Sequence, residues 1–261
     1  MKRTNHIGSR QVGIVPALVL SFACAHALSF TKVDAETIVL EPARDATLFE
    51  DSTGATASGS GPGLFAGNNA GSNTRRALLL FDVAGEVPGG ATVDSAELRL
   101  HVDSAPFPDS VSVSIHLATA IWGEGASRSN GGRGAPADTG DATWLHRHFP
   151  DELWSQAGGD FDPAGLDTLA VGPEGFVSWT GAALIQLVRE WLDNPVSNYG
   201  LLLKGEEGAP STVRRFDSRE QEPGDLRPVL TVHFTPSATP TERTTWSALK
   251  ALWRLESSAR P

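Results

Sequence analysis

The segment Thr212–Phe234, with the sequence TVRRFDSREQEPGDLRPVLTVHF, indicates the fold of this chain. Apolar residues at 213–216 and 229–234 predict two strands. The polar stretch between them contains Pro223 and Gly224, which predicts that the chain reverses direction there. Two adjacent apolar residues at the start of the second strand are typical of a strand whose two faces are both partly covered.

The composition is that of a turn-rich domain with a core of its own. The 261 residues suffice for one large domain or two small ones. The chain has 27 glycines and 17 prolines, and 40% of its residues are hydrophobic, which favours short strands over long helices. Its net charge of -10 argues against general binding to nucleic acid or to anionic membranes, because both require a surplus of lysine and arginine.

Residues 1–35 have the pattern of an export signal. Basic residues precede an apolar run at 12–22, and small side chains before positions 28 and 36 suit cleavage after Ala27 or Ala35. The alternative is a buried N-terminal helix. The run is too short to span a membrane comfortably. Cleavage after Ala35 would remove the single cysteine and leave 17 basic and 30 acidic residues. We therefore expect a secreted or cell-surface protein that has no disulfide.

Alternation of apolar and polar residues predicts half-buried strands along the rest of the chain. The clearest cases are 96–102, AELRLHV, and 111–117, VSVSIHL. Further strands are expected at 37–40, 46–49, 64–67, 75–83, 176–179 and 201–204.

One amphipathic helix is expected at 181–193, with Thr180 as its N-cap and Pro195 beyond its end. Its apolar stripe consists of Leu184, Leu187, Val188, Trp191 and Leu192. Together, about ten strands and one helix, with turns roughly every 8–12 residues, predict an all-β, jelly-roll-like antiparallel β-sandwich. Trp191 and Trp179 should lie in its core.

A long loop insertion at 121–167 interrupts this rhythm and contains the best candidates for ligand binding. These candidates are Trp122, Trp144, His146, Arg147 and Trp154. Aromatic rings stack on sugar rings, and cationic side chains bind hydroxyl or uronate groups. The alternative is that the aromatic residues form a small core beneath the insertion.

Three carboxylates in GGDFDPAGLD suggest a structural calcium site, because oxygen ligands cluster in a glycine-bearing loop. They are Asp160, Asp162 and Asp167. The EF-hand pattern fails because Ala164 and Val171 occupy two ligand positions. A solvated acidic loop is the alternative, and no other cofactor is expected.

Basic side chains at 214–227 permit two interpretations. Arg214, Arg215, Arg219 and Arg227 could form an anion-binding strand face, or they could form ion pairs that fix this segment in place. Exposed ion pairs of this kind contribute about 0–1 kcal/mol each.

Signatures of hydrolases are missing: the sequence has neither G-x-S-x-G nor H-E-x-x-H. Paired carboxylates for glycoside hydrolysis meet only in space, but we expect no enzyme activity. After a linker at 236–242, an amphipathic segment at 245–255 resembles the sorting tails of some exported bacterial proteins, with Ser247 in place of glycine. A helix that docks on the sandwich is the alternative.

Four segments in order resemble the DNRLRE domain family, which is grouped with alginate-binding carbohydrate-binding modules. They are RRALLLFDV at 75–83, ATVDSAELRLHV at 91–102, LIQLVREWLDNPVSNYGLLLKG at 184–205 and RRFDSREQEPGDLRPVLTV at 214–232. The namesake motif is approximated by DSREQE at 217–222. The resemblance covers 37–234, and implies a jelly-roll domain at 36–235, export, and non-catalytic binding of a polysaccharide. The other hypothesis is a structural or adhesive surface protein without a sugar site; burial of all three insertion tryptophans would favour it.

Overall fold

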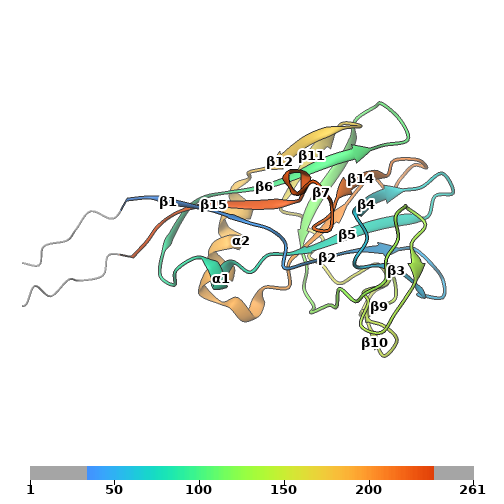
Figure 1. Cartoon of the computed structure of the whole chain (residues 1–261), viewed down its shortest axis with the longest axis horizontal. Helices are drawn as coiled ribbons and strands as arrows, with labels where there is room; N and C mark the ends of the chain where they lie inside the picture. Colours follow the sequence, from blue (N-terminus) through green and yellow to red (C-terminus); the bar gives the residue numbers. More distant parts are fainter. Residues whose placement is uncertain (1–33, 238–261) are drawn as a thin grey trace, which may run out of the picture. The chain divides into compact units, whose positions relative to one another are not determined.

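The computed structural model describes residues 34–237 (Figure 1). Its first strand begins at Glu36 and its last ends at Thr235. The expected signal peptide, apart from its last two residues, and the expected amphipathic tail lie outside the described residues.

Two antiparallel sheets make up the sandwich, which confirms the all-β class. Sheet A contains β1 (Glu36–Leu40), β4 (Gly63–Asn68), β6 (Thr92–Ser104), β12 (Gly175–Trp179), β14 (Arg214–Asp217) and β15 (Val229–Thr235). Sheet B contains β2 (Arg44–Phe49), β3 (Thr56–Ser58), β5 (Thr74–Leu80), β7 (Val111–Leu117), β8 (Ala135–Pro136), β11 (Asp167–Val171) and β13 (Leu201–Lys204). The end of β4 also pairs with β5 and joins the two sheets. A separate ribbon consists of β9 (His146–His148) and β10 (Glu152–Leu153).

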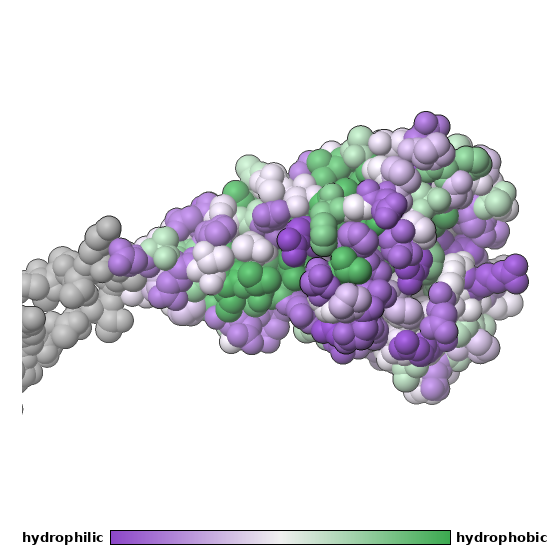
Figure 2. Space-filling model, turned by 45° about the horizontal axis from the view of Figure 1, so that its top comes forward, coloured by the Kyte–Doolittle hydropathy of each residue, from purple (hydrophilic) through white to green (hydrophobic). Residues whose placement is uncertain are grey.

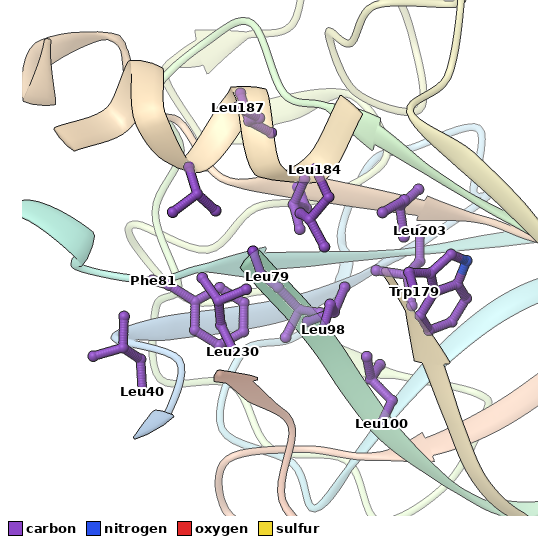
Figure 3. Packing of buried hydrophobic residues seen from close by; sticks show 14 of the residues in the cluster. Leu40, Leu79, Phe81, Leu98, Leu100, Trp179, Leu184, Leu187, Leu203 and Leu230 are labelled. Atoms are coloured by element: carbon purple, nitrogen blue, oxygen red, sulfur yellow. The ribbon is translucent and has the colours of Figure 1, made fainter. Parts of the chain in front are cut away.

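The main core lies between the two sheets and against helix α2 (Ala182–Asp193). Figure 3 shows Leu184 of α2 directed toward side chains of both sheets, among them Leu79 and Leu98, and Leu187 belongs to the same core. All five residues of the predicted stripe, Trp191 among them, are buried, and so is Trp179. The N-cap differs from the prediction: it is Gly181, whose extended backbone begins the helix without a side-chain cap.

Between β5 and β6 the chain forms a short helix, α1 (Val83–Glu86), where the sequence analysis extended the strand to 83. The carboxylate of Asp82 accepts a hydrogen bond from the N–H of Gly85 and so caps this turn. Two 3₁₀ turns, η1 (Pro195–Ser197) and η2 (Gly224–Leu226), complete the described elements.

Sheet B is covered on both faces, which explains the continuous apolar runs in its central strands. Leu79 and Leu203 face the main core, while Leu78 and Leu202 face the opposite way. A second apolar cluster forms on that outer face, where the insertion supplies Trp122, Ala142 and Trp154. The insertion is therefore a third layer of the domain.

The segment 212–234 does not form a hairpin, contrary to the prediction of a chain reversal. Strands β14 and β15 both pair antiparallel with β6, through 102–104 and 92–99 respectively. Leu98 of β6 pairs with β12 on one edge and with β15 on the other. In the same way, Val102 of β6 pairs with β12 on one edge and with β14 on the other. The chain thus follows one edge of β6 throughout, and 218–228 is an excursion between two collinear strands. A polar stretch with proline and glycine is compatible with both outcomes.

No helix within residues 34–237 combines the length and the apolar character that a membrane span requires.

Candidate functional site

Two of the insertion tryptophans are structural. Trp122 and Trp154 are 1% and 6% exposed, so neither offers an open ring face to a ligand. The indole N–H of Trp122 donates to the carbonyl of Tyr199 at 2.8 Å, and that of Trp154 donates to the carbonyl of Thr143 at 2.9 Å. Each buried indole is therefore fully satisfied, and both side chains attach the insertion to sheet B.

Trp144 is the insertion tryptophan that is not fully buried: it is partly exposed and packs against the second apolar cluster. The guanidinium of Arg76 lies 5.0 Å from its ring centroid. Trp144 lines an open groove of about 460 Å³ on the surface. The other lining residues are Glu50, Asp51, Ser52, Asn73 and Leu145. Trp144 was predicted from its own segment, whereas the residues opposite it come from the β2–β3 and β4–β5 connections and have no local signal in the sequence.

The groove is lined by hydrogen-bond acceptors of negative charge. Glu50 accepts the backbone N–H of Thr74 at 2.6 Å, and Asp51 accepts hydrogen bonds from Thr53 and Thr56. The hydrogen bonds from Thr53 lower the pKa of Asp51, so this carboxylate is ionised at neutral pH. Such a lining suits the hydroxyl groups of a neutral ligand and repels carboxylates.

The cationic candidates of the insertion are already paired with residues of the insertion itself. Arg147 forms an ion pair with Glu152 at 2.7 Å across the β9–β10 ribbon. Nδ1 of His146 lies 3.0 Å from the hydroxyl of Thr143, and its ring contacts Phe149 edge-on. Neither His146 nor Arg147 lines the groove beside Trp144.

The three aspartates proposed as calcium ligands are engaged in local turns. Asp160 accepts hydrogen bonds from Ser155 and Gln156, Asp162 accepts the N–H of Ala164, and Asp167 accepts the N–H of Thr168. They do not bring three ligand atoms within 4.8 Å of one another. Within 34–237, these three side chains therefore do not converge on one point, and the calcium site stays a prediction.

A cluster of carboxylates that the sequence did not reveal joins three segments of the chain. Asp45 in β2, Glu124 in the insertion and Glu220 in the excursion have oxygens within 4.8 Å of one another. The N–H of Arg219 donates to Asp45 at 2.8 Å, and its guanidinium lies 2.9 Å from Glu220 and 3.5 Å from Glu124. An arginine thus supplies the cation here. These residues are far apart in the sequence, so no local pattern indicates that they meet.

Burial changes the acidity of this cluster. Asp45 is 1% exposed; burial, reinforced by the negative charge of Glu220, raises its pKa well above the usual range. Burial also raises the pKa of Glu124. Both carboxyl groups therefore bind protons more tightly in the folded protein than in the unfolded chain.

We expect the variant Asp45→Asn to become more stable relative to the wild type as the pH rises. Unfolded Asp45 has a pKa of about 3.9. Because the pKa of Asp45 is higher in the folded protein than in the unfolded chain, protonation of this carboxyl group stabilises the fold at low pH. This stabilisation is lost as the pH rises through the folded pKa, at up to about 1.4 kcal/mol per pH unit. Asparagine has no such titration but keeps an acceptor for the N–H of Arg219. Urea unfolding of both proteins between about pH 5 and 8 measures the difference.

The comparison of the wild type with Asp45→Asn cancels a pH dependence of stability that has the opposite sign and is common to both proteins. Burial lowers the pKa of His116, which destabilises the fold upon acidification in both proteins alike. Asp45→Ala also lacks the titration but leaves the N–H of Arg219 without this acceptor, so it should be about 1–3 kcal/mol less stable than Asp45→Asn at every pH. Parallel stability curves for wild type and Asp45→Asn would contradict the assignment.

Comparison with known protein families gives no matching family for this sequence. None of the curated proteins matches it either.

Proposed function

We propose that this chain is a secreted or cell-surface, non-catalytic module that binds a neutral polysaccharide in the groove beside Trp144. The observation that carries the proposal is the partly exposed indole at the edge of a groove whose other walls bear Glu50, Asp51 and Asn73. An aromatic face stacks on the C–H face of a sugar ring, and carboxylates and amides bind its hydroxyls. The resemblance to the DNRLRE family, with its jelly-roll topology and export, supports the same class.

Charge argues for a neutral ligand in this groove. The two carboxylates would repel a uronate, and the cation closest to the indole, Arg76, is already paired with Glu207 at 2.8 Å. Affinity should be weak, between micromolar and millimolar, because one shallow aromatic platform buries little area.

A structural or adhesive role is the second candidate, and a specific observation favours it. Trp122 and Trp154 belong to the apolar cluster beneath the insertion, so two of the three aromatic candidates stabilise the domain. In this case the insertion would be a covering layer, and the groove beside Trp144 would have no ligand.

Calorimetric titration with neutral glucans and with alginate tests the proposal on the wild type, Trp144→Ala and Arg147→Ala. We expect the wild type to bind a neutral glycan and Trp144→Ala to bind it at least about five-fold more weakly, since stacking on one ring contributes about 1 kcal/mol. Arg147→Ala should keep its affinity within about two-fold, because Arg147 pairs with Glu152.

The two variants also define what would contradict the proposal. If the wild type binds a glycan and Trp144→Ala binds it equally well with its fold intact, the site is elsewhere. A loss of binding confined to Arg147→Ala would instead assign the site to the β9–β10 ribbon. Absence of binding to every neutral glycan would favour the structural role.

A further inference from the structure

The groove beside Trp144 carries negative charge that the chain does not pair with a cation. Glu50 and Asp51 line the groove, and neither forms an ion pair with another described residue. The hydrogen bonds that they accept come from neutral donors, among them the N–H of Thr74 for Glu50 and the N–H and hydroxyl of Thr53 for Asp51. Both carboxylates are only half-buried, so a ligand in the groove reaches them.

Two arginines of β5 lie near this groove, but their guanidinium groups are engaged elsewhere. Nε and Nη2 of Arg76 donate to the two oxygens of Glu207 at 2.8 and 3.0 Å. The guanidinium of Arg75 lies 5.1 Å from the ring centroid of Phe49 and donates to three backbone carbonyls, and it forms no ion pair with Glu50. A cation that enters the groove would therefore meet carboxylates whose charge no ion pair has already neutralised.

The remaining surface around the groove suits a polar ligand with several hydrogen-bonding groups. Ser52 and Asn73 are exposed on its walls. Figure 2 shows mainly hydrophilic side chains toward the lower right of the domain, where Figure 1 places β3 and the β9–β10 ribbon. An ammonium group has three donors and no acceptor, which matches ionised carboxylates, and cations are attracted to the face of an indole. The charge that repels a uronate here therefore favours a substituent of the opposite sign.

We propose that the groove beside Trp144 prefers an amino sugar with a protonated amino group, such as a glucosamine unit of a glycan, over the neutral sugar of the same backbone. The inference rests on the proposed function, because it concerns one substituent of the sugar ring that stacks on Trp144. The ammonium group would donate to Glu50 and Asp51, while the C–H face of the ring lies against the indole. The two carboxylates thus select the charge of the ligand, and the indole supplies affinity for the ring.

Calorimetric titration with three β-1,4-linked tetrasaccharides tests this preference: those of glucose, N-acetylglucosamine and glucosamine. They share one backbone and differ in the group on the second ring carbon, which is a hydroxyl, a neutral acetamide or an ammonium group. At about pH 5.5 the amino group is protonated and Asp51, whose pKa is lowered by the hydrogen bonds from Thr53, is ionised. We expect the glucosamine tetramer to bind at least about five-fold more tightly than the glucose tetramer. This advantage should shrink at about 0.5 M salt, because salt screens partly exposed charges.

Variants locate the preference at the two carboxylates. Glu50→Gln and Asp51→Asn each remove one charge but keep an acceptor for a backbone N–H, and each should reduce the ratio of the two affinities by about half. Glu86→Gln is the matched control, because it removes the same charge from an exposed side chain without a described partner on α1, away from β3 and the β9–β10 ribbon (Figure 1). It should leave the ratio unchanged. Trp144→Ala should weaken the binding of all tetramers, and thermal unfolding verifies that each variant is folded.

The outcomes separate this inference from the proposed function. Equal binding of the glucose and glucosamine tetramers would overturn the preference and leave the proposed function in place. The preference would also be wrong if the N-acetylglucosamine tetramer bound as tightly as the glucosamine tetramer, or if Glu86→Gln reduced the ratio as much as Asp51→Asn, since general attraction to an acidic protein would then explain it. If the glucosamine tetramer does not bind, or binds equally well to folded Trp144→Ala, the groove is not its site and the inference fails.

Discussion

Replacing Trp191 by alanine is expected to lower the free energy of unfolding by about 3–5 kcal/mol. The indole is 1% exposed and belongs to the main core, where α2 packs against both sheets. Its Nε1 has no hydrogen-bond partner among the described residues, so truncation costs packing and leaves a cavity without breaking a hydrogen bond. Urea denaturation with a fluorescence or circular-dichroism readout measures the change.

Two further variants make this result specific. Trp191→Phe keeps most of the apolar volume and removes the unpartnered N–H, so it should cost less than half as much as alanine. Trp144→Ala removes an indole that is partly exposed on the insertion, and its effect should also be clearly smaller. A loss below about 1 kcal/mol for Trp191→Ala would mean that the stripe of α2 does not contribute to the core.

The periodicity of apolar residues predicted those features of the fold that depend on a single segment. The stripe of α2 and the alternation in β6 each follow from burial of one face, and the structure confirms both. This periodicity was less informative in short strands that contain charged residues. In RRFD, alternation places Arg214 on the inward face with Phe216, but no local pattern indicates the carbonyls of distant segments that accept hydrogen bonds from this buried arginine.

Contacts between segments that are far apart in the sequence could not be predicted from local patterns. The path of 212–234 depends on which strand its two halves pair with, and both pair with the same edge of β6. Likewise, the groove combines Trp144 with Glu50 and Asn73, which approach one another only because the insertion packs on sheet B. The aromatic density of the insertion was a real signal, but it indicated a packing layer as much as a site, since burial and stacking both require large rings.

Replacing Arg214 by alanine should be the second large effect, at about 3–5 kcal/mol. This guanidinium is 0% exposed and has no carboxylate within salt-bridge distance among residues 34–237. It donates instead to backbone carbonyls of three separate segments, those of Asp109, Val171, Gly172, Thr212 and Val213. Truncation would leave the buried acceptors among them, the carbonyls of Val171 and Thr212, without this donor and would open a cavity, so two costs combine.

The neighbouring arginine is the control for this prediction. Arg215 points to the outer face, where it pairs with the exposed Asp103 and lies 3.8 Å from Asp217, so Arg215→Ala should cost about 1 kcal/mol and clearly less than Arg214→Ala. Arg214→Lys keeps the charge but offers fewer donors in a different geometry, and its loss should fall between the two. Because β11, β14 and the β6–β7 loop meet at this one side chain, hydrogen exchange should accelerate in all three segments in Arg214→Ala. Equal losses for Arg214→Ala and Arg215→Ala would show that the buried guanidinium does not join these segments.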